Sequence, residues 1–189
     1  MIELVYPSGI APRLKESGVA VAAEMLPVVD PNGFVTAQAS REYCHSGAKP
    51  LHPVVHLHII NREGQIYLQQ RGAHKSLLPL MWDTAVGGHV SYGEFIVETL
   101  YREAQEELGL VDFHPYGILC YEFESQTERE LINVYATVGT FTLKPNPDEL
   151  EGGRFWSPEE IDANIGKGVF TPNFESEYAR IKDAIQSLL

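Results

Sequence analysis

The stretch GGHVSYGEFIVETLYREAQEELGL, residues 87–110, concentrates glutamates within a single predicted helix. Apolar residues recur at helical spacing between residues 94 and 108, and Gly109 is a natural helix end. At 100° per residue, one side of this helix gathers the residues expected to face the core, namely Val97, Leu100, Tyr101, Ala104 and Leu108.

Glu103, Glu106 and Glu107 fall together on another side of the predicted helix. Residues three or four apart on a helix lie about 5–6 Å apart at Cβ, where like charges repel each other. A divalent cation compensates that repulsion, and Mg²⁺ favours oxygen ligands. A backbone carbonyl of the preceding glycine loop, at Gly87, is a further candidate ligand. The alternative for the glutamates alone is an ordinary solvated acidic helix face.

The composition describes one acidic globular protein. The chain has 189 residues, 44% of them hydrophobic, and a formal net charge of −12. An acidic surface argues against duplex nucleic acid as a partner, since that binding relies on basic contacts to phosphate. Two separated cysteines, no leader-like N-terminus and no long apolar run predict a cytoplasmic protein without a membrane segment. A small anionic substrate held through a metal remains compatible with these charges.

The order of elements predicts an α/β fold with a mixed β-sheet and helices on its faces. Residues 24–40 read as a β-hairpin, and residues 54–71 as two strands joined by a turn. Two further strands follow the acidic helix, and a capping box at Ser157 starts another helix. We therefore expect an N-terminal extension over residues 1–50, with no clear signal in residues 1–23, and a main domain over residues 51–189. A homodimer through the N-terminal hairpin is plausible.

The acidic stretch resembles the complete Nudix box, in which a glycine and a glutamate precede the pattern REUXEEXGU, where U is aliphatic. Its fixed positions are matched by Gly88, Glu94, Arg102, Glu103, Glu106, Glu107 and Gly109. Seven such matches at roughly 6% usage each arise by chance on the order of once in a million. The resemblance therefore identifies the family strongly and the substrate weakly.

The resemblance implies an α/β/α sandwich with a loop–helix–loop metal site that uses Mg²⁺ or Mn²⁺. Members typically hydrolyse a diphosphate bond in a small anionic substrate, often a nucleoside diphosphate derivative. By match to the motif, Glu103 and Glu107 would be metal ligands and Glu106 a ligand or base. Arg102 would orient a glutamate, with Glu94 or Glu98 as its candidate partner.

Residues 69–94 are also similar to isopentenyl-diphosphate isomerases, a branch of the same superfamily. The similarity implies that Arg71 and Lys75 hold diphosphate oxygens. Glu130 matches a catalytic acid of the isomerases, and in a hydrolase it would be an extra ligand or base. Where the isomerases carry a catalytic cysteine, this chain has Gly87, and its box is intact whereas theirs is degenerate.

A metal-dependent Nudix hydrolase is therefore the leading hypothesis. An isomerase-like double-bond shift and a nucleotide-sensing module without turnover are the alternatives. His89 adjoins the box and is a candidate substrate contact. His56 and His58 share one face of a predicted strand, either as a metal pair or as ordinary half-buried histidines.

Overall fold

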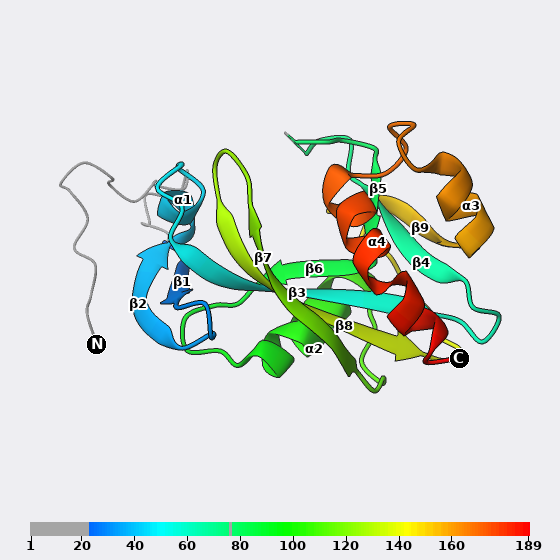
Figure 1. The fold of residues 1–189 in the computed structure, drawn as a ribbon, viewed down its shortest axis with the longest axis horizontal. Coiled ribbons are helices and arrows are strands. Elements are labelled where there is room, and N and C mark those ends of the chain that lie inside the picture. The colour runs from blue at the N-terminus through cyan, green and yellow to red at the C-terminus, as the bar shows by residue number, and fades with distance from the viewer. Residues whose placement is uncertain (1–22, 76) are drawn as a thin grey trace. The chain divides into compact units, whose positions relative to one another are not determined.

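A computed structural model describes residues 23–75 and 77–189 (Figure 1). The expectations for residues 1–22, including the absence of a leader, lie outside these residues. The chain divides into two compact units. The first holds the residues up to Val54 together with His89–Ile96 and Tyr121–Ile132, and the second holds Val55–Gly88, Val97–Cys120 and Asn133–Leu189. Over the described ranges, none of the helices has the length and apolar character needed to cross a membrane.

The predicted N-terminal hairpin is confirmed as the antiparallel pair β1 (Met25–Val29) and β2 (Val35–Ser40) (Figure 1). Its turn is closed by the Asp30 carboxylate, which accepts from the backbone N–H groups of Asn32 and Phe34. Gly33 has a φ of 84°, a value that glycine adopts without strain.

A short helix, α1 (Arg41–Cys44), follows this hairpin where the sequence predicted only a connector. The Ser40 hydroxyl caps it by accepting from the Tyr43 N–H. One turn is too short to show helical periodicity, which is why the pattern did not reveal it. Cys44 packs in a small core with Leu26 and Ala39.

Within residues 23–75 and 77–189, seven strands form the main sheet, with β5–β4–β3–β8–β7 as its order, β6 beside β3 and β9 beside β4. Strand β4 runs antiparallel to β3, β5 and β9. The strands of this sheet are β3 (Leu51–Ile60), β4 (Ile66–Arg71), β5 (Trp82–Thr84), β6 (Val86–His89), β7 (Tyr116–Glu124), β8 (Arg129–Val138) and β9 (Leu150–Trp156). The strands predicted from the sequence are confirmed as β3, β4, β7 and β8. The α/β class with an added N-terminal hairpin is thus the fold observed.

The described part of the chain also contains the longer helices α2 (Ile96–Leu108), α3 (Pro158–Asn164) and α4 (Pro172–Gln186). The predicted capping box is present at α3, where Ser157 and Glu160 each accept from the other's backbone N–H. Thr171 caps α4 by accepting from the Phe174 N–H. These caps fix where both C-terminal helices begin.

Helix α2 carries the box glutamates, and its buried face differs from the predicted one. Val97 is 46% exposed, so its placement in the core was wrong. Thr99 and Glu107 are buried instead, together with the predicted Leu100, Ala104 and Leu108. The buried stripe is therefore rotated toward the acidic side, and a glutamate lies within it.

Candidate active site and metal centres

Glu107 projects from the buried face of α2 toward the glycine loop at β6. Its side chain is held by two donors at 3.3 Å, the Gln69 amide Nε2 and the Gly87 backbone N–H, both to Oε2. Glu103 lies against Gly88, where an added Cβ would overlap the Glu103 carboxyl group. Glycine at position 88 is therefore what lets the loop backbone approach this carboxylate closely.

The two carboxylates share a poorly hydrated environment. Burial first, and then the neighbouring charge of Glu103, raise the pKa of Glu107 to about 8. Burial likewise raises the pKa of Glu103 above its ordinary value. Buried like charges are costly unless protonated or neutralised by a cation. The donor set of hard oxygens beside an exposed backbone loop fits Mg²⁺ or Mn²⁺.

Glu149 is a third carboxylate in this region, and sequence reasoning did not find it. Its charge raises the pKa of both Glu103 and Glu107. The loop that carries it is tied to α2, because the Asn146 N–H donates to the Glu107 carbonyl at 2.8 Å. Glu149 lies far from the box in sequence and belongs to no motif, so no local spacing identified it.

Arg102 forms ion pairs with two of the box glutamates, Glu103 and Glu106. Its Nη1 lies 2.8 Å from Glu103 Oε1 and 3.1 Å from Glu106 Oε2. The Glu106 side chain is 53% exposed, in contrast to 15% for Glu103. The three glutamates thus differ in exposure, with Glu103 and Glu107 turned inward and Glu106 turned toward solvent, while Arg102 contacts both Glu103 and Glu106.

The two cations predicted to hold diphosphate have different surroundings. Arg71 donates to the carbonyls of Leu77 and Leu78 at 3.0 and 3.1 Å and to Asp83 at 3.3 Å. It therefore secures the loop that follows β4, using three of the five N–H donors of a guanidinium. Lys75 Nζ lies 3.8 Å from Glu149, and its charge lowers the pKa of Glu107. Lys75 thus lies within the electrostatic reach of the buried carboxylates.

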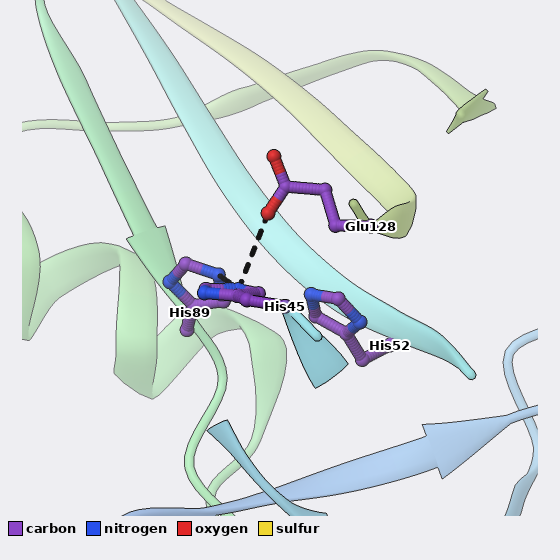
Figure 2. A group of neighbouring side chains, drawn as sticks. All are labelled: His45, His52, His89 and Glu128. Carbon is purple, nitrogen blue, oxygen red and sulfur yellow. Dashed lines mark hydrogen bonds and ion pairs between the residues drawn. The ribbon is translucent and has the colours of Figure 1, made fainter. Parts of the chain in front are cut away.

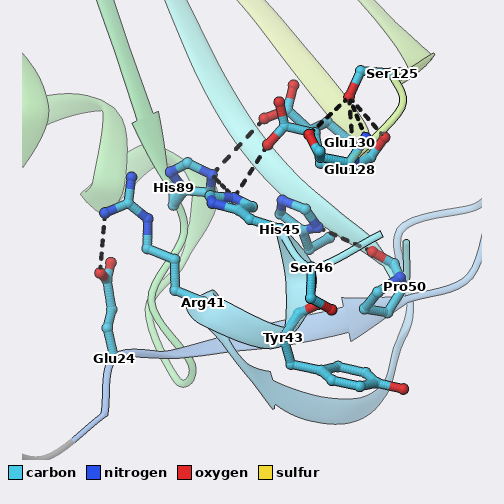
Figure 3. Close-up of polar contacts among 12 residues, drawn as sticks. Glu24, Arg41, Tyr43, His45, Ser46, Pro50, His89, Ser125, Glu128 and Glu130 are labelled. Atoms are coloured by element: carbon cyan, nitrogen blue, oxygen red, sulfur yellow. Dashed lines mark hydrogen bonds and ion pairs between the residues drawn. The ribbon is translucent and has the colours of Figure 1, made fainter. Parts of the chain in front are cut away.

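A second group of potential metal ligands lies in the other unit. His45, His52, His89 and Glu128 each offer one ligand atom, and these atoms lie within 4.8 Å of one another (Figure 2). His45 Nε2 is 3.0 Å from His89 Nε2 and 3.3 Å from Glu128 Oε2. Glu130 Oε1 lies 3.8 Å from His89 Nε2 (Figure 3).

The chemistry of this histidine group suits a transition metal. His52 is fully buried, its Nδ1 contacts the Pro50 carbonyl at 3.0 Å, and its Nε2 has no hydrogen-bond partner. Burial lowers the pKa of His45 and His52, which favours the neutral imidazole that binds metals. Imidazole and carboxylate ligands together suit ions such as Mn²⁺, Fe²⁺ and Zn²⁺.

Sequence reasoning found part of this second group. It singled out His89 as a substrate contact and Glu130 as an extra ligand or base, and the structure brings those two side chains within 3.8 Å of each other. It missed His45, His52 and Glu128, which come from three separate segments of the chain. Only the fold makes them neighbours.

Comparisons with known proteins agree with this geometry. The NUDIX domain model matches residues 50–174. The uncharacterized Nudix hydrolase YfcD of Shigella flexneri is 33% identical over 156 residues, covering 80% of this chain and 83% of YfcD. An isopentenyl-diphosphate Delta-isomerase of Paenarthrobacter aurescens is 30% identical over 144 residues, covering 72% of this chain and 78% of the isomerase.

Among solved structures, DR0079 from Deinococcus radiodurans superposes with a TM-score of 0.71 and 27% identity. The match covers 83% of this chain and 98% of DR0079. Sequence, fold and the glutamates set against a glycine loop agree, and the chain belongs to the NUDIX family.

Proposed function

We propose that this protein is a metal-dependent Nudix hydrolase that cleaves a diphosphate bond in a small anionic substrate. A nucleoside diphosphate derivative is the first class to test. Membership of the family supports a pyrophosphohydrolase activity. The observation that carries the proposal is the set of buried or partly buried carboxylates beside the Gly87–Gly88 loop.

Glu103 and Glu107 would hold the divalent cation, with the Gly87 carbonyl as a further ligand. When bound, Mg²⁺ or Mn²⁺ neutralises charge on the diphosphate oxygens and acidifies a water molecule. Arg102 keeps Glu103 in place through its 2.8 Å contact. These roles follow from the motif and agree with the inward direction of the two glutamates.

A carboxylate within reach can accept the proton of the attacking water. Glu106 and Glu149 are the candidates for this base, since Glu107 is occupied by Gln69 and Gly87. Lys75 and the remaining donors of Arg71 would bind diphosphate oxygens by charge-assisted hydrogen bonds. His89 belongs to the histidine group, which would bind a second metal ion, and Glu130 lies 3.8 Å from His89.

A release screen tests the proposal. The protein would be incubated with Mg²⁺ or Mn²⁺ and nucleoside diphosphate sugars, dinucleoside polyphosphates, coenzyme A derivatives and isoprenoid diphosphates. The expected result is metal-dependent formation of phosphomonoester products from at least one class. Tight binding across the panel without any release would instead favour a non-catalytic sensing module.

Isopentenyl-diphosphate isomerisation is a second candidate, supported by the 30% identity to the Paenarthrobacter isomerase. Its weakness is Gly87, because glycine has no side chain to move a proton to or from carbon. A Cβ at this position would meet His56 only at ordinary contact distance, so packing does not enforce the glycine. Incubation with isopentenyl diphosphate decides the matter, and formation of the dimethylallyl isomer at a useful rate would reverse the ranking.

A further inference from the structure

A buried carboxylate links helix α4 to strand β3 within the second unit. Glu177 is fully buried, and its two oxygens contact two histidines of β3. His56 Nδ1 lies 2.8 Å from Oε2, and His58 Nε2 lies 2.7 Å from Oε1. From the sequence alone these histidines are either a metal pair or ordinary half-buried residues, and neither description includes the carboxylate between them.

The two imidazoles stabilise the ionised form of the buried Glu177 carboxylate. Burial alone would raise the pKa of Glu177, yet the two imidazoles outweigh burial and lower it. An ionised carboxylate without such partners would be costly at this depth. The contact to Nδ1 therefore fixes the orientation of the His56 ring and directs its Cδ2–Nε2 edge away from Glu177.

That edge faces Gly87. A Cβ placed on Gly87 would lie 3.5 Å from His56 Cδ2 and 3.7 Å from His56 Nε2. Gly87 is exposed, while the His56 side chain is 17% exposed. The missing side chain of Gly87 thus leaves a gap bounded by the edge of the imidazole. The N–H of the same glycine contacts Glu107, so this gap adjoins the candidate metal-binding carboxylates.

Nothing in the backbone requires glycine at this position. Gly87 is not among the residues with positive φ, and the contacts its Cβ would make are ordinary van der Waals distances. The gap is therefore available for a substrate group of the size of a side-chain atom. Because it adjoins Glu107, the substrate group in question is the diphosphate rather than the moiety attached to it.

We propose that His56 is a substrate-binding residue that contacts a diphosphate oxygen over Gly87, and that Glu177 is the positioning residue that holds its ring there. The proposal rests on the proposed hydrolase function and adds a residue outside the Nudix box to it. A diphosphate oxygen accepts hydrogen bonds, so His56 would act as the doubly protonated imidazole, with Nδ1–H donating to Glu177 and Nε2–H donating to the substrate. His58 completes the support by contacting the second oxygen of Glu177.

The test measures binding of methylenediphosphonate, whose P–C–P bridge resists hydrolysis, by calorimetry in the presence of Mg²⁺. Gly87→Ala fills the gap while keeping the backbone N–H and carbonyl. His56→Asn removes the ring edge but retains a donor for Glu177. His114→Asn, at an exposed histidine in the same unit, is the matched control. Mn²⁺ titration without diphosphonate reports on metal binding separately.

Each of Gly87→Ala and His56→Asn is expected to weaken diphosphonate binding by at least about tenfold, the worth of one hydrogen bond to a charged group. The double variant should bind diphosphonate about as weakly as the weaker-binding single variant, because both changes remove the same contact. Glu177→Gln should produce a smaller loss, and His114→Asn none. Mn²⁺ affinity should remain within about twofold of wild type in the His56 variant.

The other outcomes separate this inference from the function on which it rests. Equal diphosphonate binding by wild type and both single variants would overturn the role of His56 and leave the hydrolase proposal standing. A parallel loss of Mn²⁺ binding would also overturn it, since His56 would then act on the metal loop and not on substrate. Failure of the wild-type protein to bind diphosphonate with Mg²⁺ would count against the hydrolase proposal itself, and this inference would fall with it.

Discussion

At the scale of single residues, burial of the Glu107 carboxylate destabilises the folded protein. This side chain is 8% exposed and lies on the buried stripe of α2, where an apolar residue would stabilise the helix more simply. Its two neutral donors, from Gln69 and Gly87, do not supply a balancing charge. Retention of an acid at such a position is understandable if a cation binds there.

The raised pKa of Glu107 has a consequence for stability in the metal-free protein. Its pKa is raised from the ordinary 4.5 to about 8, so the folded state binds the proton more tightly than the unfolded state does. The free energy of unfolding should therefore fall as pH rises from about 4.5 to about 8. Urea unfolding with a chelator at several pH values measures this.

Glu107→Gln isolates that effect, since glutamine does not titrate. The variant should lose the part of the pH dependence that Glu107 contributes and should be more stable than wild type near pH 8 without metal. Identical pH profiles for the two proteins would show that Glu107 is ionised in the folded state over this whole range.

Arg71 is predicted to serve the loop that follows β4 as well as substrate. Its planar guanidinium contacts two loop carbonyls and Asp83, a fork that lysine cannot reproduce. Arg71→Lys should raise KM for the diphosphate substrate by about tenfold or more and accelerate amide hydrogen exchange in residues 72–81. A raised KM with unchanged exchange would limit the role of Arg71 to substrate binding.

At the scale of elements, the sequence predicted what local patterns encode. The hairpin at residues 24–40, the acidic helix and the capped helix α3 were found because turn residues, periodicity and caps act within a few positions. Helix α1 was missed because a single turn has no period. The buried face of α2 was partly wrong because packing partners, which periodicity does not contain, determine that Glu107 replaces Val97 in the core.

The capping box of α3 gives a prediction at this scale. Ser157→Ala removes the acceptor for the Glu160 N–H and should reduce the free energy of unfolding by about 1 kcal/mol. Ser187→Ala, at the C-cap of α4, is the comparison, because its hydroxyl only donates to the Asp183 carbonyl. Denaturant unfolding of both variants would reveal the difference, and equal losses would mean that the box contributes little.

At the scale of the whole chain, both candidate sites depend on residues that are distant in sequence. The Nudix box was recognisable because its spacing is local. Glu149, just before β9, joins Glu103 and Glu107, and Glu177 of α4 joins His56 of β3. His45, His52 and Glu128 join His89 from three other segments. Sequence spacing does not predict such contacts between distant residues, since they depend on tertiary folding.

Two classes of metal site are therefore expected in one chain. Titration with Mn²⁺ should resolve a site that Glu107→Gln removes and another that His45→Asn removes, with each variant retaining the other class. Zn²⁺ should prefer the histidine group and Mg²⁺ the carboxylates, because imidazole suits the former ion and oxygen ligands the latter. A wild-type protein with a single class of site, or one variant that abolishes both, would contradict this.

The most direct test of the central claim is the rate of Mg²⁺-dependent diphosphate hydrolysis in wild type, Glu107→Gln and Glu63→Gln. Glu63 is an exposed glutamate in the turn between β3 and β4 and serves as the matched control. If Glu107 holds the cation, its replacement should lower turnover by about a hundredfold or more, while Glu63→Gln retains the wild-type rate and both variants stay folded. Undiminished turnover in a folded Glu107→Gln protein would contradict the account.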